Sequence, residues 1–280
     1  MNKMAKQTQN MGKLVTIVHL YPKEMNIYGD LGNIITLKRR LEWRGVGVVL
    51  KQVSLGETEF PAGDIYFMGG GQDNDMYSVF ADLIALKKDF LKNEVLKGKV
   101  FLLICGAFQL FGQYFLDASG RKIAGLGLLP LETSAPGDQL RDRCLGNLLT
   151  VIRPGIAAEI HKAYPDAVYE RKGELPTLVG FENHSGQTYF LDESIVPLAT
   201  VKFGKGNNAK QKIEGAKYLN VFGSYSHGSL LPKNPHLADY LIWLALKNKY
   251  GTGFDWLQLD DEIEWRAHLV MQKRLEKNGK

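Results

Sequence analysis

Short runs of apolar residues alternate along the first half of the chain with longer segments in which apolar residues recur at helical spacing. The runs that predict buried strands lie at 14–20, 46–53, 65–68 and 100–104. The segments with helical spacing lie at 31–44, where Asp30 is expected to cap the helix, and at 76–96. Strands that alternate with helices favour a doubly wound α/β fold, a mostly parallel sheet with helices on both faces.

The second half of the chain is less regular. We expect a short strand at 125–131 and a polar loop at 132–143. Further strands are expected at 145–152, 177–182, 198–203 and 218–226, followed by an amphipathic helix at 236–250.

This pattern divides the chain into three parts. Residues 1–12 are polar without periodicity and are interpreted as a disordered leader, and 13–250 as one domain. Residues 251–280 form a charged C-terminal tail that we expect to be helical. Trp256 and Trp265 in so charged a tail suggest that it docks, either onto the domain or onto a partner.

Composition narrows the function classes. The chain has 280 residues, of which 45% are hydrophobic, enough for a full core. No run reaches the roughly 18 apolar residues of a membrane span, and the polar N-terminal stretch lacks a signal-peptide core, so we expect a cytoplasmic protein. The 35 basic and 30 acidic residues are interspersed, which does not favour nucleic-acid binding. Two cysteines, Cys105 and Cys144, lack the spacing of a disulfide framework or a zinc site, so no metal is expected.

The stretch K-V-F-L-L-I-C-G-A-F-Q-L-F-G at 99–112 carries the strongest chemical signal. A buried strand ends at Cys105, and Gly106 with Ala107 permits a sharp turn into a short helix. This arrangement places a sulfur at the carboxyl edge of the sheet, beside the first amides of a helix, as in a nucleophile elbow. Taken alone, Cys105 is equally well interpreted as a small buried hydrophobe.

A second glycine-rich loop follows the strand at 65–68. The residues G-G-G-Q-D at 69–73 lack the Lys and Ser or Thr of a P-loop, so ATP binding is unsupported. A tight turn without chemistry is the simpler interpretation of this loop. Beside Cys105, however, its amides could supply an oxyanion donor together with Gly106.

Polar residues also gather at later strand ends. Arg141 and Arg143 precede the strand at 145–152, and an arginine there could clamp a carboxylate or simply be solvated. Glu182, Asn183 and His184 stand in succession, and for His184 a structural role is favoured over that of a base. His227 ends the strand at 218–226, where a turn histidine and the base of a Cys-His pair are both consistent with its position.

The separated motifs together resemble those of the triad-type, or class I, glutamine amidotransferases, in their cobyric-acid-synthase-like branch. The run C-G-A-F-Q at 105–109 is similar to the C-G-G-Y-Q-type elbow of that branch. Four further motifs stand in the expected order over about 14–250: Y-G-D-L-G-N at 28–33, G-F-E-N-H-S-G at 180–186, F-G-K-G-N-N at 203–208 and H-G-S-L-L-P-K-N at 227–234.

The resemblance implies a role for particular residues. Cys105 would be the nucleophile and His227 the base and later the acid. The oxyanion donors would be Gly70, Gly71 and Gly106, the substrate would be held by Arg143, Gln109 and Asn183, and Glu182 and His184 would support the site. Ala107 replaces the second glycine of the elbow, and Ser229 stands where a carboxylate usually orients the histidine. Another residue or a partner subunit must therefore orient His227 if the site is active.

The resemblance also implies a reaction and a partner. The chain would hydrolyse L-glutamine through a thioester and pass ammonia to a separate, MurT-like subunit related to the Mur ligases. That partner would bind ATP and Mg²⁺ and amidate D-glutamate of lipid II to D-isoglutamine, and this chain would carry no cofactor. A heterodimer is expected, at the inner face of the membrane through the partner. The resemblance implies a flavodoxin-like sheet as well. The alternatives are a catalytically weak scaffold subunit of the same type of complex, with a decayed site, and an unrelated cysteine hydrolase on a flavodoxin-like sheet.

Overall fold

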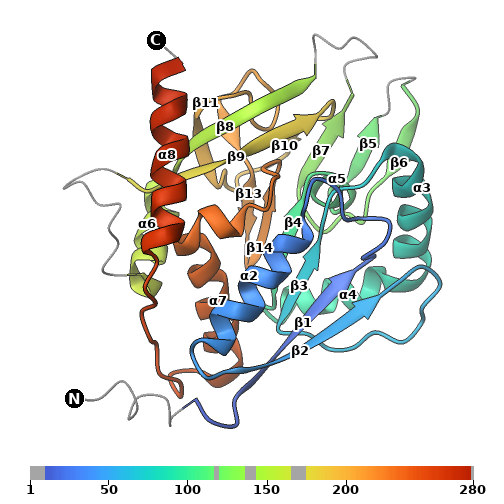
Figure 1. Ribbon diagram of the computed structural model, residues 1–280. Helices are drawn as coiled ribbons and strands as arrows, with labels where there is room; N and C mark the ends of the chain where they lie inside the picture. The colour runs from blue at the N-terminus through green and yellow to red at the C-terminus, as the bar shows by residue number, and fades with distance from the viewer. Residues whose placement is uncertain (1–9, 117–119, 136–142, 165–174, 279–280) are drawn as a thin grey trace, which may run out of the picture.

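The computed structural model of the chain describes residues 10–116, 120–135, 143–164 and 175–278. At its centre lies a six-stranded sheet in the order β13-β14-β4-β3-β1-β2 (Figure 1). Its strands are β1 (Leu14–Leu20), β2 (Gly47–Val53), β3 (Ile65–Met68), β4 (Val100–Ile104), β13 (Ala216–Tyr218) and β14 (Val221–Ser224). All neighbours are parallel except β13 and β14, which form an antiparallel hairpin where one strand at 218–226 was expected. The doubly wound α/β fold is thereby confirmed.

Helices cover both faces of this sheet (Figure 1). One layer contains α2 (Leu31–Glu42) and α7 (Pro235–Tyr250), and the other contains α3 (Asp73–Asp82), the π-helix η1 (Leu83–Lys87) and α4 (Lys88–Leu96). Right-handed crossovers produce the two layers because the chain moves outward from β1 to β2 but in the opposite direction from β3 to β4. The strand order therefore reverses between β1 and β3, where open α/β sheets bind their ligands.

The helix expected at 76–96 is interrupted by the π-turn. The wider turn brings Lys87 into the core, where it is 1% exposed and pairs with Asp82. Asp82 also accepts a hydrogen bond from the Tyr21 hydroxyl at 2.6 Å. The interruption thus satisfies a buried lysine that a regular α-helix would place differently.

Two smaller sheets flank the central one. The first contains β5 (Tyr114–Leu116), β6 (Lys122–Ala124), β7 (Leu131–Ser134) and β10 (Gln187–Phe190). The second contains β8 (Cys144–Ile152), β9 (Thr177–His184), β11 (Ala199–Phe203) and β12 (Ile213–Glu214). Two further helices are α5 (Gly106–Leu110), which follows β4, and α6 (Pro154–Ala163), which follows β8. The expected strand at 125–131 is wrong, because the Leu126 amide bonds to Leu110 O at 2.9 Å instead of to a strand. The loop expected at 132–143 is wrong for its first residues, because they belong to strand β7.

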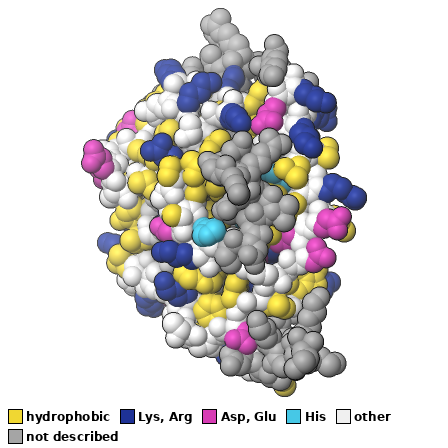
Figure 2. Space-filling model, turned by 90° about the vertical axis from the view of Figure 1, so that its left-hand side faces the viewer, with side chains coloured by type: hydrophobic (Ala, Val, Ile, Leu, Met, Phe, Trp, Pro, Cys, Tyr) yellow, Lys and Arg dark blue, Asp and Glu magenta, His cyan; other side chains and the backbone are white. Residues whose placement is uncertain are grey.

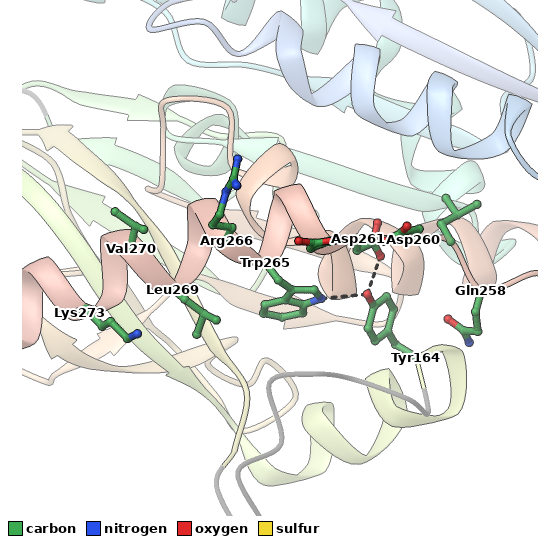
Figure 3. Close-up of a pocket in the computed structure, with 11 residues that line it drawn as sticks. Tyr164, Gln258, Asp260, Asp261, Trp265, Arg266, Leu269, Val270 and Lys273 are labelled. Carbon is green, nitrogen blue, oxygen red and sulfur yellow. Dashed lines mark hydrogen bonds between the residues drawn. The ribbon is translucent and has the colours of Figure 1, made fainter.

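The C-terminal tail docks onto the domain. After the 3-10 helix η3 (Leu231–Lys233) and α7, helix α8 (Glu262–Asn278) runs beside the second flanking sheet (Figure 1). Trp265 is 2% exposed, and its Nε1 donates to Tyr164 Oη at 3.0 Å (Figure 3). The Tyr164 hydroxyl in turn donates to Asp261 at 2.5 Å. Of the two docking alternatives, the domain is therefore the one that buries Trp265.

A buried ion-pair network links this tail to α2. Arg40 donates to Asp239 of α7 at 2.6 Å and, through both terminal nitrogens, to Asp261 at 2.6 and 2.9 Å. Arg44, one turn further along α2, donates to the other oxygen of Asp239 at 2.6 Å. Asn10 is also buried and donates to Arg44 O at 2.9 Å, so the expectation of a disordered leader is wrong for this residue. Residues 1–9 of that leader lie outside the described residues.

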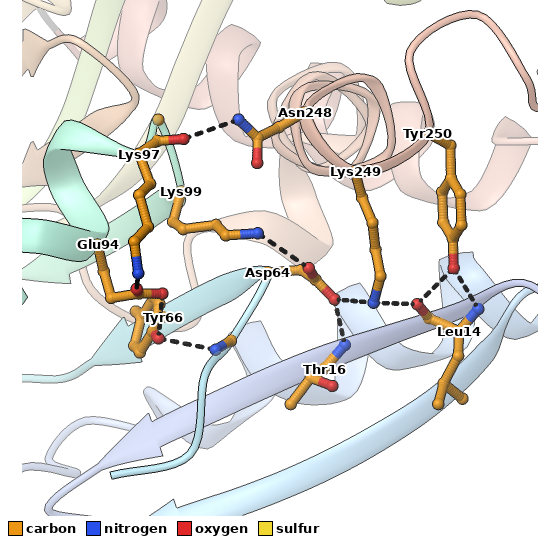
Figure 4. A network of polar contacts seen from close by, with 12 residues as sticks. Leu14, Thr16, Asp64, Tyr66, Glu94, Lys97, Lys99, Asn248, Lys249 and Tyr250 are labelled. Carbon is orange, nitrogen blue, oxygen red and sulfur yellow. Dashed lines mark hydrogen bonds and ion pairs between the residues drawn. The ribbon is translucent and has the colours of Figure 1, made fainter.

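The amino edge of the central sheet is closed by a second polar network (Figure 4). Asp64, directly before β3, accepts hydrogen bonds from the Thr16 amide at 2.9 Å, Lys249 at 2.7 Å and Lys99 at 3.3 Å. Tyr250 Oη accepts a bond from the Leu14 amide at 2.8 Å. These contacts join β1 and β3 to the C-terminal end of α7.

The surface beside α6 and α8 mixes hydrophobic, basic and acidic side chains (Figure 2). On this face the net positive charge is not gathered into a single basic patch, which agrees with the interspersed charges of the sequence. None of the helices in the described ranges combines the length and the apolar content that crossing a bilayer requires.

Candidate active site

Cys105 stands at a strained turn between β4 and α5. Its φ of 52° and ψ of −107° are unusual for a residue with a side chain. Two hydrogen bonds hold this backbone, from Cys105 N to Ser224 O at 2.8 Å and from Gln109 N to Cys105 O at 3.1 Å. The conformation directs the side chain out of the sheet, as a nucleophile elbow requires. Cys105 is 6% exposed and lines a cavity of about 430 Å³, within the size range of small-ligand sites.

His227 lies beside this cysteine because β14 and β4 are neighbouring parallel strands. Ser224, the last residue of β14, pairs with Ile104, so the chain beyond each strand emerges at the same edge. The ring is fully buried, and its Nδ1 lies 3.2 Å from Asp30 Oδ1. Among the described residues no group meets hydrogen-bond geometry with Nε2, and Cys105 is the side chain that acts on the imidazole there.

Asp30 supplies the carboxylate that the sequence seemed to lack. It was expected to cap α2, but its side chain makes no capping bond, and that expectation is wrong. Instead Oδ1 faces His227, and Oδ2 accepts the Gly70 amide at 2.8 Å. Ser229, at the usual carboxylate position, donates to Gly29 O at 2.5 Å and so anchors the loop that presents Asp30. The glycines around Asp30 were the available signal, since they let a buried carboxylate approach the sheet edge closely.

The partners of His227 determine its charge. Burial alone would lower the pKa of the imidazole, but the hydrogen bond with Asp30 and the interaction with Cys105 outweigh burial and raise the pKa of His227 to about 10. The imidazolium is therefore the stable form at neutral pH. A cation beside sulfur favours the thiolate, which is the nucleophilic form of cysteine.

The glycine loop after β3 lies beside His227 and the elbow at Cys105. A Cβ on Gly70 would stand 2.8 Å from His227 Cε1, which explains the absence of a side chain there. Because the Gly70 amide is bonded to Asp30, its expected role as an oxyanion donor is wrong. The Gly71 nitrogen lies 3.3 Å from the point that a Cβ on Gly106 would occupy, and Gly71 lines the cavity. Gly71 and Gly106 are thus the adjacent amides at the elbow.

Arg143 reaches the same cavity from the start of β8. Its Nε donates to Asn183 Oδ1 at 2.6 Å, and its backbone carbonyl accepts a bond from Lys205 Nζ at 2.7 Å. Within the described part of the chain, the two terminal nitrogens of its guanidinium make no hydrogen bond, so a planar fork is available to a carboxylate. Arg141 lies outside the described residues.

The remaining predicted residues divide into two groups. Gln109 lines the cavity and donates to Tyr225 Oη at 3.0 Å, and Asn183 lines it beside Arg143. Glu182 is buried and accepts the Lys205 and Gly206 amides, both at 2.7 Å, so it fixes a loop. His184 stacks on Tyr225 with ring centroids 3.7 Å apart, and burial lowers its pKa to about 3, which suits a neutral structural ring.

Cys144 differs from Cys105 in each respect that matters for reactivity. It lies within β8, it is fully buried, and burial raises the pKa of its thiol to about 11. Its interpretation as a structural residue agrees with this environment.

In the described ranges, no three His, Cys, Asp or Glu side chains converge closely enough to hold a metal ion.

Comparison with known proteins gives relatives that fit this geometry. Residues 16–235 match the CobB/CobQ-like glutamine amidotransferase domain. The subunit GatD of lipid II isoglutaminyl synthase (glutamine-hydrolyzing) from Streptococcus pneumoniae is 41% identical over 85% of this chain and 82% of its own length. GatD of Staphylococcus aureus is 34% identical over 95% of this chain and 98% of its own length.

A solved structure agrees with the fold. The structure of PurLQS from Thermotoga maritima matches with a TM-score of 0.50 and 14% identity, over 85% of this chain and 99% of the matched chain. The resemblance inferred from the motifs is therefore confirmed at the level of the whole domain. The elbow at Cys105, the matched domain and the two relatives together show that this chain belongs to the CobB/CobQ-like glutamine amidotransferases.

Proposed function

We propose that this chain hydrolyses L-glutamine to glutamate and ammonia by nucleophilic catalysis at Cys105. The observation that carries the proposal is a cavity lined by a strained cysteine and an arginine fork, with an imidazole held by a buried carboxylate beside that cysteine. A thiolate attacks the side-chain amide, and the guanidinium binds the carboxylate at the other end of the substrate.

The first half of the reaction releases ammonia. The Cys105 thiolate forms a bond to the amide carbon, and the tetrahedral oxyanion is stabilised by the Gly71 and Gly106 amides. His227 then transfers its Nε2 proton to the amide nitrogen, and the carbon–nitrogen bond breaks to give ammonia and a γ-glutamyl thioester. Asp30 keeps the Nδ1 proton in place and orients the ring.

The second half regenerates the thiolate. Once the sulfur is acylated, its negative charge no longer raises the pKa of His227, so the imidazole becomes a better base. It takes a proton from water as the oxygen attacks the thioester carbon. Glutamate leaves when the carbon–sulfur bond breaks and His227 holds the proton again.

The name that the two relatives share extends the proposal to a complex. They are subunits of a lipid II isoglutaminyl synthase, and we propose that this chain likewise supplies ammonia to a partner subunit. The partner would be a Mur-ligase-like, MurT-like protein that binds ATP and Mg²⁺ and converts D-glutamate of lipid II to D-isoglutamine. The complex would work in the cytoplasm, at the inner face of the membrane, with no cofactor in this chain.

The proposal is tested by removing the sulfur. Cys105→Ala should abolish glutamate release from glutamine, measured with the chain alone and with its partner, because no other group can form the thioester. Cys144→Ala is the matched control and should retain wild-type turnover, since its thiol is sealed within β8. Glutamate release by Cys105→Ala at the wild-type rate would exclude this mechanism.

A further inference from the structure

Tyr28 occupies an unusual place at the mouth of the cavity. It lies in the loop between β1 and α2, two residues before Asp30, and lines the cavity together with Cys105 and Arg143. Its φ of 52° is rare for a bulky residue, and its side chain is 44% exposed. A strained backbone costs free energy, and a residue that is nearly half exposed does not recover this free energy through packing.

The ring of Tyr28 contacts the catalytic imidazole. Its centroid lies 5.0 Å from that of His227 at an interplanar angle of 75°, an edge-to-face arrangement. Phe181 packs on Tyr28 at 6.0 Å, and Phe181 O accepts the His227 amide at 2.7 Å. The imidazole therefore has Asp30 at Nδ1 and an aromatic ring against its side, which together fix the direction of Nε2.

The hydroxyl of Tyr28 belongs to a different chain of contacts. Asn183 Nδ2 donates to Tyr28 Oη at 2.7 Å, and Asn183 Oδ1 accepts from Arg143 Nε at 2.6 Å. An arginine Nε–H can only donate, so it must face the amide oxygen, which leaves the amide nitrogen to face the tyrosine hydroxyl. Arg143 thus decides which way the Asn183 amide faces, and Tyr28 holds the amide nitrogen in the position from which Asn183 binds the guanidinium.

We infer that Tyr28 is a positioning residue that joins the substrate clamp to the catalytic base through two separable contacts. The hydroxyl, through Asn183, aims the free fork of Arg143, and the ring aims His227 at Cys105. This inference rests on the proposed function. It adds a positioning role for Tyr28, which takes part in none of the catalytic steps given above. Binding of the substrate carboxylate and orientation of the imidazole then share one side chain.

The two contacts are separated by two substitutions. Tyr28→Phe keeps the ring and removes the hydroxyl, so KM for glutamine should rise about three- to tenfold, the effect of one lost hydrogen bond, while kcat changes less than about twofold. Tyr28→Leu removes the ring as well, and kcat should fall by about tenfold or more relative to Tyr28→Phe. Tyr250→Phe is the matched control, because it loses a bonded hydroxyl at the amino edge, and it should keep both constants.

Alkylation of Cys105 supplies a second measurement. A chloroketone analogue of glutamine carries the carboxylate that Arg143 would bind, whereas iodoacetamide does not. In Tyr28→Phe, the saturation constant for the chloroketone should rise as KM does, and the iodoacetamide rate should stay at the wild-type value. In Tyr28→Leu, the iodoacetamide rate should fall as well, since the imidazole is no longer fixed.

Two results would overturn the inference. One is a Tyr28→Phe variant with the wild-type KM and saturation constant, and the other is a parallel change of KM and kcat in both Tyr28 variants. Either result, with an active wild-type chain and an inactive Cys105→Ala variant, excludes the two separable contacts assigned to Tyr28 and leaves the proposed function standing. A wild-type chain that releases no glutamate even with its partner removes the proposed function itself.

Discussion

Two buried carboxylates stand at opposite edges of the central sheet and differ in what their partners can still do. Asp64, at the amino edge, accepts hydrogen bonds from two lysines and the Thr16 amide, and both lysine ammonium groups form ion pairs with it. Asp30, at the carboxyl edge, faces a histidine whose second nitrogen points to Cys105. A carboxylate that ends a network stabilises the fold, whereas one that orients a group with a free nitrogen supports chemistry.

The largest expected effect comes from Asp30→Asn. The amide keeps the size of the side chain but no longer stabilises the imidazolium, so kcat should fall by about 10²- to 10⁴-fold, as when a triad carboxylate is lost. Steady-state glutamate release measures this effect. Ser229→Ala is the control, because the Ser229 hydroxyl donates to Gly29 O, and it should lose less than about tenfold.

A different result would remove the contrast. If Ser229→Ala were the more damaging change, the turn after His227 would orient the imidazole and Asp30 would be a structural residue. Near-wild-type turnover in Asp30→Asn would assign the orienting role to a group outside this chain.

The second prediction concerns Asp64→Asn, which should act on stability alone. Removing the charge weakens the bonds to Lys99 and Lys249, and we expect a loss of about 2 to 3 kcal/mol in the free energy of unfolding, reduced in part because both lysines are partly exposed. Urea unfolding measures the loss. At temperatures where the variant is folded, kcat and KM should equal those of the wild type, and a selective fall in kcat would contradict the division between the two edges.

The third and smallest prediction compares how the two edges respond to acid. His184 lines the cavity at the carboxyl edge, whereas no histidine takes part in the Asp64 network of Figure 4. The pKa of His184 is about 3 in the folded protein against 6.5 for the ordinary side chain. The unfolded chain therefore binds the extra proton, and stability that is complete above about pH 6.5 is lost as the pH falls toward 3. From about pH 7.5 to about pH 5 this amounts to about 2 kcal/mol.

The measurement compares the wild type with His184→Gln by urea unfolding at both pH values. His184→Gln should be less stable at neutral pH because its contact with Tyr225 is lost, but its stability should fall less on acidification by about 2 kcal/mol. Equal losses in the two proteins would mean that His184 is charged when folded.

The sequence predicted the inner strands and the elbow because their signals are local. Val100 to Ile104 is an unbroken apolar run that ends at the cysteine, and all five residues are buried. Three strands of the second flanking sheet, β8, β9 and β11, lie where strands were expected at 145–152, 177–182 and 198–203. The first flanking sheet was missed because strands such as β5 and β6 have three residues each and show no alternation. Their existence depends on pairing partners elsewhere in the chain.

The contact between Asp30 and His227 shows the limit of local patterns most clearly. Asp30 stands where a helix cap is expected, and its partner His227 is 197 positions away. Only the sheet order, which brings the ends of β1, β3 and β14 to one edge, makes the contact possible. Gly70 was assigned to the oxyanion for a related reason, since its bond to Asp30 also joins residues far apart in the sequence, here 40 positions.

The buried ion-pair network of Arg40 and Arg44 in α2 bears on how this chain tolerates truncation or tagging at its C-terminal end. Asp261 lies close to the C-terminus, yet it neutralises Arg40 in the same helix that begins next to Asp30. Deleting the last helix with its preceding segment would leave two buried guanidinium groups sharing Asp239 alone. A purification tag is therefore better appended beyond α8 than used to replace it, because the loss of Asp261 would disturb Arg40 in the helix that follows Asp30.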